Sequence, residues 1–158
     1  MEHVQLGRSG LSVSRLCLGT MIFGSQLDET AAFAVMDRAV ELGIDFVDVA
    51  DVYPVPPSPE TSGRTEEIVG RWLRSRTPAV TLATKCMGPM GPGANDRGGS
   101  RKHVIEACEA SLRRLQVERI DLYYLHHPDP VVPIEETLEA LDRLVRDGKV
   151  HYIGVSNF

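Results

Sequence analysis

Short apolar runs alternate along this chain with longer segments in which apolar residues recur every three or four positions. The runs lie at residues 16–19, 46–50, 80–85, 120–126 and 152–155. Runs of this length predict buried strands, and the spacing in the longer segments predicts amphipathic helices. A buried strand followed repeatedly by a helix predicts an α/β fold with a parallel sheet and right-handed crossovers.

Capping residues mark the expected helix boundaries. Asp28, Thr65 and Ser100 are predicted to cap the first three helices, because their short polar side chains can accept hydrogen bonds from first-turn N–H groups. The fourth helix is predicted from about Ile134 to Asp147. The residues expected to face inward are Ala32, Val35, Met36, Ala39 and Val40 in the first helix, and Leu138, Leu141, Leu144 and Val145 in the fourth.

An N-terminal β-hairpin is expected before the first buried strand. Two short alternating segments, residues 4–6 and 11–13, flank the turn residues 7–10. This arrangement is typical of two antiparallel strands joined by a turn.

Two parallel architectures fit this order of elements. An open doubly wound sheet suits 158 residues, whereas a (β/α)8 TIM barrel typically needs about 250. Both place functional side chains at the carboxyl ends of strands, but only a barrel gathers those ends at one mouth. Polar side chains follow four consecutive strands, which favours a barrel. We therefore expect residues 1–158 to form one partial (β/α)8 barrel, truncated after about the fifth strand.

Composition narrows the functional classes. The chain is 42% hydrophobic and 25% charged, which is ordinary for a globular domain. Its net charge is −5 and its basic residues are scattered, so neither nucleic acid nor a membrane surface is an expected partner. No apolar run approaches the roughly 20 residues of a membrane span, and residues 1–3 do not resemble a signal peptide. A cytoplasmic location is expected.

The three cysteines, Cys17, Cys86 and Cys108, are widely spaced and odd in number. This pattern fits reduced thiols better than disulfides or a zinc site. Cys86 follows Lys85, so it is either a reactive thiolate or a small packing residue, and packing is the favoured interpretation.

A carboxylate inside an apolar run indicates a candidate site. Asp48 interrupts the run 46–50, and a buried Asp is costly without a cationic or hydrogen-bonding partner. Lys85, which ends the next run, is the predicted partner. His126 ends the run after that, and Tyr53 follows the Asp48 strand. Each also has a structural interpretation: an ion pair for Asp48 and Lys85, a surface aromatic for Tyr53, and a core histidine for His126.

Two long loops follow the second and third buried strands. Residues 54–59 are rich in proline, so they are either a rigid connector or a loop on the substrate side. Residues 88–99 are rich in glycine but lack the spacing of a phosphate-binding loop.

In these motifs the chain resembles the N-terminal part of an aldo-keto reductase. The resemblance rests on residues 18–21, 43–53, 83–85, 121–126 and 148–158. It implies a barrel enzyme that uses NADPH to reduce aldehydes or ketones, with no metal. The positions matching the family's catalytic tetrad are Asp48, Tyr53, Lys85 and His126. The positions matching its cofactor site are Gly19, Thr20, Met21 and Asp48, together with Ser156 and Asn157 at the carboxamide.

The implied chemistry explains why such groups belong together. Carbonyl reduction delivers a hydride to carbon and a proton to oxygen, so a positioned acid is required. Phenols ordinarily titrate near pH 10, and a neighbouring ammonium lowers that value. The resemblance therefore implies that Tyr53 is the acid, with Lys85 beside it and Asp48 holding Lys85 in place. His126 is implied as a hydrogen-bond donor to the carbonyl oxygen.

The alternative is a non-catalytic, reductase-like fragment or regulatory module that works through association. The family barrel continues beyond the residues matched here, so an unclosed sheet edge is expected. Such an edge favours self-association or pairing with a complementary C-terminal fragment. Otherwise the expected partner is a small-molecule carbonyl substrate. Pro54 stands where the family more commonly has a glycine, so the resemblance does not extend to the shape of the substrate pocket.

Overall fold

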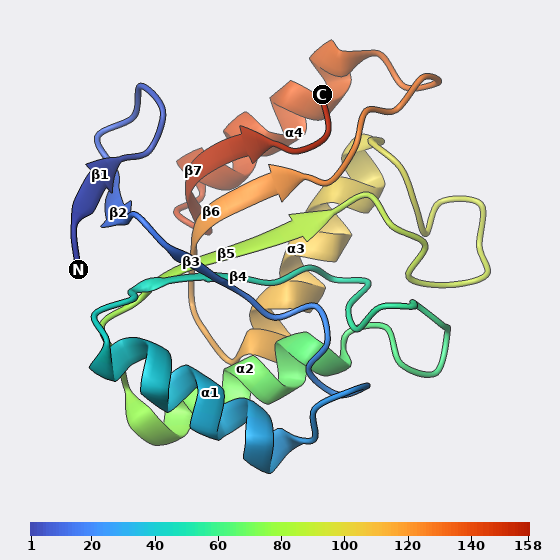
Figure 1. Cartoon of the computed structure of the whole chain (residues 1–158). Coiled ribbons are helices and arrows are strands. Elements are labelled where there is room, and N and C mark those ends of the chain that lie inside the picture. The colour runs from blue at the N-terminus through green and yellow to red at the C-terminus, as the bar shows by residue number, and fades with distance from the viewer.

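A five-stranded parallel sheet forms the centre of the protein. A computed structural model describes residues 1–158, and its strands follow one another in chain order, β3-β4-β5-β6-β7 (Figure 1). The strands are β3 (Cys17–Gly19), β4 (Phe46–Asp48), β5 (Thr81–Cys86), β6 (Ile120–Leu125) and β7 (Val150–Val155). Every neighbouring pair is parallel, which confirms the predicted sheet.

Four helices connect the strands and pack against one face of the sheet (Figure 1). They are α1 (Glu29–Glu41), α2 (Arg64–Arg76), α3 (Arg101–Leu115) and α4 (Ile134–Arg146). A doubly wound sheet carries helices on both faces and reverses its strand order. Sequential strands with helices on one side are instead the arrangement of a (β/α) barrel wall. The structure therefore favours the barrel type over the doubly wound sheet, and the five strands form an open sheet.

The main core lies between the sheet and the helices. Its largest fully buried side chains include Met36 of α1, Trp72 of α2, Leu115 of α3, Tyr123 of β6 and Leu141 of α4. Because side chains alternate along a strand, every second strand residue contributes to this layer.

The inward faces of α1 and α4 are narrower than predicted. Ala32, Met36 and Ala39 are buried in α1, and Leu141 and Leu144 are buried in α4. The predictions for four other residues were wrong, because they keep more than a third of their surface exposed. These are Val35, Val40, Leu138 and Val145. The buried residues form one stripe along each helix, and the four exposed ones lie at the edges of that stripe.

Two of the three predicted helix caps are confirmed. Asp28 accepts a hydrogen bond from the N–H of Ala31 at 2.8 Å, and Ser100 accepts one from the N–H of His103 at 3.3 Å. The Thr65 cap was wrong. Helix α2 begins two residues earlier than a Thr65 cap implies, after the N-cap Gly63, whose φ of +88° suits a residue without a side chain. The Thr65 hydroxyl instead donates to the carbonyl of Phe23 at 2.7 Å.

The predicted N-terminal hairpin is present. Strands β1 (His3–Gln5) and β2 (Ser12–Ser14) pair antiparallel and lie beside the end of the sheet where the parallel strands begin (Figure 1). Val13 of β2 packs on the face of the sheet opposite the helices. The hairpin therefore covers the end of the sheet away from the carboxyl ends of the strands.

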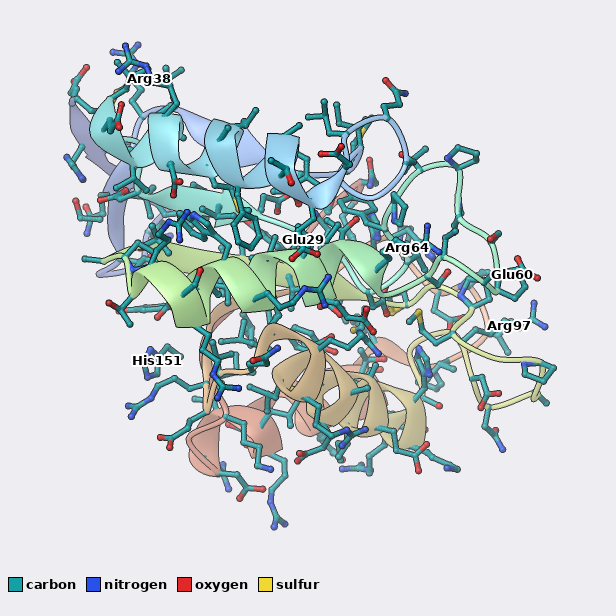
Figure 2. All side chains as sticks on the ribbon, turned by 90° about the horizontal axis from the view of Figure 1, so that it is seen from below. Glu29, Arg38, Glu60, Arg64, Arg97 and His151 are labelled. Carbon is teal, nitrogen blue, oxygen red and sulfur yellow. The ribbon has the colours of Figure 1, made fainter.

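The outer surface of the helices is polar. Glu29 of α1 lies where α1 and α2 meet, and its carboxylate is 2.7 Å from the guanidinium of Arg71 (Figure 2). Surface pairs of this kind contribute about 0–1 kcal/mol each, so they do not determine the fold. Each helix is too short or too polar to cross a lipid bilayer.

Candidate active site

Alternation along the strands places three predicted side chains on one face of the sheet. Phe46, Ala83 and Leu122 form a small cluster on the face away from the helices. Asp48, Lys85 and His126 follow these residues at even spacings, so they lie on the same face. They also stand at or just after the carboxyl ends of β4, β5 and β6. The structure therefore brings together residues that are far apart in the chain.

Asp48 has the partner that its burial requires. The Lys85 amine donates to the Asp48 carboxylate at 2.5 Å and to the carbonyl of Val49 at 2.9 Å. Burial raises the pKa of the Asp48 carboxyl above its usual value, and the Lys85 ammonium opposes that shift. The Lys85 side chain is only 8% exposed, so this pair is screened far less than a surface pair.

Tyr53 lies beside the same amine. Its hydroxyl is 3.4 Å from the Lys85 Nζ, which also stands 4.9 Å from the centre of the phenol ring. The backbone of Tyr53 is held by the start of α2, because the N–H groups of Gly63 and Thr65 both donate to its carbonyl. Helix α2 therefore positions the phenol, although Tyr53 itself belongs to a loop.

His126 meets Tyr53 edge to face, with ring centres 5.9 Å apart and planes at 78°. Burial lowers the pKa of His126 to about 4, and the positive charges of Lys85 and His127 add to the shift. At neutral pH the imidazole is therefore uncharged. A neutral imidazole still carries one N–H, so it can donate a hydrogen bond to an oxygen placed between the two rings.

The lowered pKa of His126 predicts acid-sensitive stability. The unfolded chain takes up a proton at this histidine near pH 6.5, whereas the folded chain resists until about pH 4. Stability is therefore lost as the pH falls through this window. His126→Gln removes the titration, so we expect the variant to lose less stability than the wild type between pH 7 and 5.

Urea unfolding at both pH values, followed by the fluorescence of the single tryptophan, measures this difference. The substitution His151→Gln is the control, because His151 is exposed on β7. An equal pH dependence in His126→Gln and the wild type contradicts the prediction.

The predicted cofactor segment follows β3. Gly19 and Met21 are exposed, and a side chain added at Gly19 would meet no atom within 4 Å, so this surface is open. Thr20 differs from its neighbours. Its side chain is fully buried and its hydroxyl donates to the carbonyl of Asp48 at 2.8 Å. Thr20 thus links the open segment to the catalytic candidate Asp48.

Ser156 and Asn157 lie beside His126. The Asn157 Nδ2 donates to the carbonyl of His126 at 2.9 Å and to the Ser156 hydroxyl at 3.1 Å, and the Ser156 N–H donates to the carbonyl of Leu125. The side-chain amide oxygen of Asn157 and the hydroxyl proton of Ser156 make no hydrogen bond within the chain. One acceptor and one donor side by side match the two halves of a primary carboxamide. These residues therefore fit the nicotinamide end of the implied cofactor.

The two long loops enclose a cleft of about 460 Å³ at the same end of the sheet. Its lining is largely proline, from Pro57, Pro59, Pro89 and Pro92, with Met90 between them. Arg97, in the second loop, points outward (Figure 2). The interpretation of residues 54–59 as a substrate-side loop stays a prediction.

Other titratable groups behave as structural residues. Cys86 is fully buried and burial raises its thiol pKa, so its packing role is supported and a thiolate is disfavoured. No group of three or more His, Cys, Asp or Glu side chains is arranged to hold a metal ion.

Two fully buried carboxyls beside the site were missed in the sequence. Asp51 lies in the apolar stretch 49–53, which carries the same signal that identified Asp48. Glu66 lies three residues before Val69, on the inward stripe of α2, where a charged residue is unexpected. Both could have been found by asking which carboxylates fall at predicted core positions.

Comparison with known proteins decides the family. The Aldo/keto reductase family model matches residues 15–158. The chain belongs to the aldo-keto reductase family. Members of this family are oxidoreductases that generally use nicotinamide cofactors, and their fold is the (β/α)8 barrel that the order of strands indicates.

Curated relatives agree with this assignment. The chain is 47% identical over 165 residues to the uncharacterized oxidoreductase YrpG of Bacillus subtilis, covering 100% of this chain and 50% of that protein. It is 41% identical over 182 residues to Protein tas of Escherichia coli, covering 99% and 52%. It is also 39% identical over 162 residues to a probable voltage-gated potassium channel subunit beta of Arabidopsis thaliana, covering 100% and 47%. The chain spans about half the length of the curated relatives it matches.

Proposed function

We propose that this chain carries the catalytic centre of a cytoplasmic, NADPH-dependent oxidoreductase that reduces an aldehyde or ketone to an alcohol. The observation that carries the proposal is the Tyr53 hydroxyl, 3.4 Å from an amine that is itself 2.5 Å from the Asp48 carboxylate. Membership of the aldo-keto reductase family supports the same class of chemistry. A phenol, an amine, a carboxylate and an imidazole around one small volume suit proton delivery to a carbonyl oxygen.

Each residue of the proposed centre has a distinct role. Tyr53 donates its hydroxyl proton to the substrate oxygen as that oxygen gains negative charge. Lys85 stabilises the phenolate that remains, because an ammonium 3.4 Å away favours the charged form. Asp48 holds the Lys85 amine in place through their contact. Neutral His126 donates a hydrogen bond to the same substrate oxygen and so orients the carbonyl against Tyr53.

The proposed cofactor site uses residues on both sides of this centre. When bound, NADPH supplies the hydride that reduces the carbonyl carbon. Ser156 and Asn157 would hold its carboxamide through the free hydroxyl proton and the free amide oxygen. Gly19, Thr20 and Met21 would lie along the nicotinamide and ribose, where the surface beside Gly19 is open. Asp48, whose backbone carbonyl accepts the hydrogen bond of Thr20, borders both the proposed cofactor site and the catalytic centre.

Cofactor binding tests this assignment directly. Titrating the 17.4 kDa chain with NADPH and following nicotinamide fluorescence should give a saturable signal. Asn157→Asp should weaken NADPH binding by roughly ten-fold. The substitution replaces the amide donor that fixes Asn157 with a carboxylate, whose negative charge repels the negatively charged cofactor.

Asn95→Asp is the matched control, because Asn95 is the other asparagine of the chain and is exposed in the loop 88–99. Equal affinity of both variants would remove Asn157 from the proposed site. An absence of any signal with wild type would reject cofactor binding by this chain.

A second proposal is association as a non-catalytic subunit. It is favoured by the similarity to a protein described as a probable potassium channel subunit beta, and by the apolar side chains of Ile153 and Val155 on β7, which are 42% and 53% exposed. Size-exclusion chromatography of the sample used for the NADPH titration separates the two proposals. An oligomer that does not bind NADPH would favour the subunit, whereas NADPH binding would favour the reductase.

A further inference from the structure

Glu66 is a fully buried carboxylate that joins three elements next to the candidate active site. It belongs to the first turn of α2, yet its side chain has no exposed surface. Its Oε1 accepts a hydrogen bond from the Thr84 hydroxyl of β5 at 2.6 Å, and its Oε2 accepts one from the Arg114 Nε of α3 at 2.7 Å. Both oxygens are therefore occupied, and loss of either contact would leave a buried charge short of a partner.

The hydrogen bond between Glu66 and Thr84 fixes the residue of β5 that precedes Lys85. Thr84 directly precedes Lys85, and alternation turns these two side chains to opposite faces of the sheet. Glu66 thus holds β5 from the helix side, at the residue next to the one that enters the site. The backbone of Lys85 has a separate contact, because the Asp51 N–H donates to the Lys85 carbonyl at 3.1 Å.

Arg114, the second partner of Glu66, packs against Gly63, and Gly63 in turn bonds to the Tyr53 backbone. A side chain added at Gly63 would approach the Arg114 Cδ to 2.7 Å, so the stem of Arg114 lies directly on this glycine. The Gly63 N–H donates to the Tyr53 carbonyl at 3.1 Å. The same arginine that pairs with Glu66 therefore covers the residue that anchors the Tyr53 backbone.

A second buried carboxyl, Asp51, makes no hydrogen bond or ion pair with Arg114. Asp51 has no exposed surface, and its Oδ1 accepts a hydrogen bond from the Val52 N–H while its Oδ2 has no partner. Burial and the nearby Glu66 carboxylate raise the pKa of Asp51 well above its usual range, and Arg114 and Lys85 only partly oppose this. This shift favours the uncharged form of Asp51, and neither Asp51 oxygen bonds to the guanidinium. Glu66 is the carboxylate that pairs with Arg114.

We propose that Glu66 is a positioning residue that sets the separation between the Tyr53 hydroxyl and the Lys85 amine, through Thr84 on one side and Arg114 on the other. The inference rests on the proposed function, because this separation affects a rate only where Tyr53 supplies the proton. At 3.4 Å the two atoms are at the outer limit of a hydrogen bond, so a small displacement breaks their contact.

Substitutions at Thr84 test the proposal without placing a new group in the site. Thr84→Val removes the hydroxyl but keeps the shape, so Glu66 loses one partner. Thr84→Ser keeps the hydroxyl and removes only a methyl group. We expect kcat for NADPH-dependent reduction of an aromatic aldehyde to fall roughly ten- to hundred-fold in Thr84→Val and to recover in Thr84→Ser, with NADPH affinity unchanged in both.

Thr137→Val is the matched control for a merely structural effect. Thr137 is also buried, and its hydroxyl donates to the carbonyl of Gly99 at 2.6 Å, so the variant also loses one buried hydrogen bond. A fall in kcat confined to Thr84→Val supports the proposal. An unchanged kcat in Thr84→Val overturns it, and so does a fall in all three variants that follows their urea midpoints.

A second measurement is independent of turnover, so failure of the proposed function can be told apart from failure of this inference. The chain has four tyrosines, and ¹³C labelling of their Cζ atoms gives a resonance for Tyr53 that is assigned by its loss in Tyr53→Phe. We expect this resonance to move in Thr84→Val but not in Thr84→Ser or Thr137→Val. If the wild type does not turn over, the proposed reductase activity fails for this chain. A Tyr53 resonance unmoved in Thr84→Val would still overturn the positioning role.

Discussion

Replacing Tyr53 with phenylalanine is expected to lower the rate of carbonyl reduction by roughly 10²- to 10⁴-fold, the range that general acid catalysis contributes. The substitution removes only the hydroxyl, which lies 3.4 Å from the Lys85 amine. The ring keeps its contact with His126, because that contact is edge to face and needs no oxygen. The measurement is steady-state oxidation of NADPH with an aldehyde substrate.

Tyr152→Phe is the matched control. Tyr152 lies on β7 and packs in the cluster that includes Val13 of the hairpin, and its hydroxyl lies beside Gly10 and not beside Lys85. We expect NADPH affinity in Tyr53→Phe to stay close to that of the wild type, since the proposed carboxamide contacts belong to Ser156 and Asn157. Near wild-type turnover in Tyr53→Phe would exclude Tyr53 as the acid and leave the reductase proposal without its proton donor.

Lys85→Met is expected to damage both activity and folding. Removing the amine leaves the Asp48 carboxylate without its partner, and breaking a buried pair costs about 3–5 kcal/mol. We expect about 3 kcal/mol, the lower end, because the Asp48 side chain keeps 24% exposure. Reduction should fall by at least about 10²-fold, because the phenolate of Tyr53 loses the cation that stabilises it. Urea unfolding and steady-state kinetics measure the two effects.

The double variant Asp48→Asn/Lys85→Met separates stability from chemistry. Neutralising both partners removes the unpaired charge, so the double variant should recover most of the lost stability. Its activity should stay low, because the amine next to Tyr53 is still missing. Recovery of activity together with stability would show that the pair only supports the fold, which was the structural interpretation of these residues.

Local patterns in the sequence predicted the parallel sheet and the contacts across strand ends. Asp48 could be assigned to Lys85 because a carboxylate in an apolar run needs a cation, and the next strand ends in one. The common face of Asp48, Lys85 and His126 follows from alternation once the strands are known to be neighbours. Their roles in catalysis stay proposals.

Features that depend on packing between distant elements could not be predicted. Thr65 has the chemistry of a helix cap, but its hydroxyl donates to the carbonyl of Phe23, far away in the sequence. Gly63 occupies the N-cap position instead. Val35 and Leu138 have the correct helical spacing, but the width of the buried stripe is set by how closely each helix approaches the sheet. The place of Glu66 on the inward stripe of α2 can be found in the sequence, but its partner cannot, because Arg114 lies 48 residues away.

Thr84 and Lys85 are neighbours in the chain, yet one faces the helices and the other faces the proposed site. Engineering of such an enzyme usually varies the residues that line the pocket. In this protein that choice would miss the helix-facing residues that hold the same strand from behind. Libraries that vary a pocket residue of β5 together with its helix-facing neighbour would sample additional geometries of the site. Substitutions of pocket residues alone do not produce these geometries.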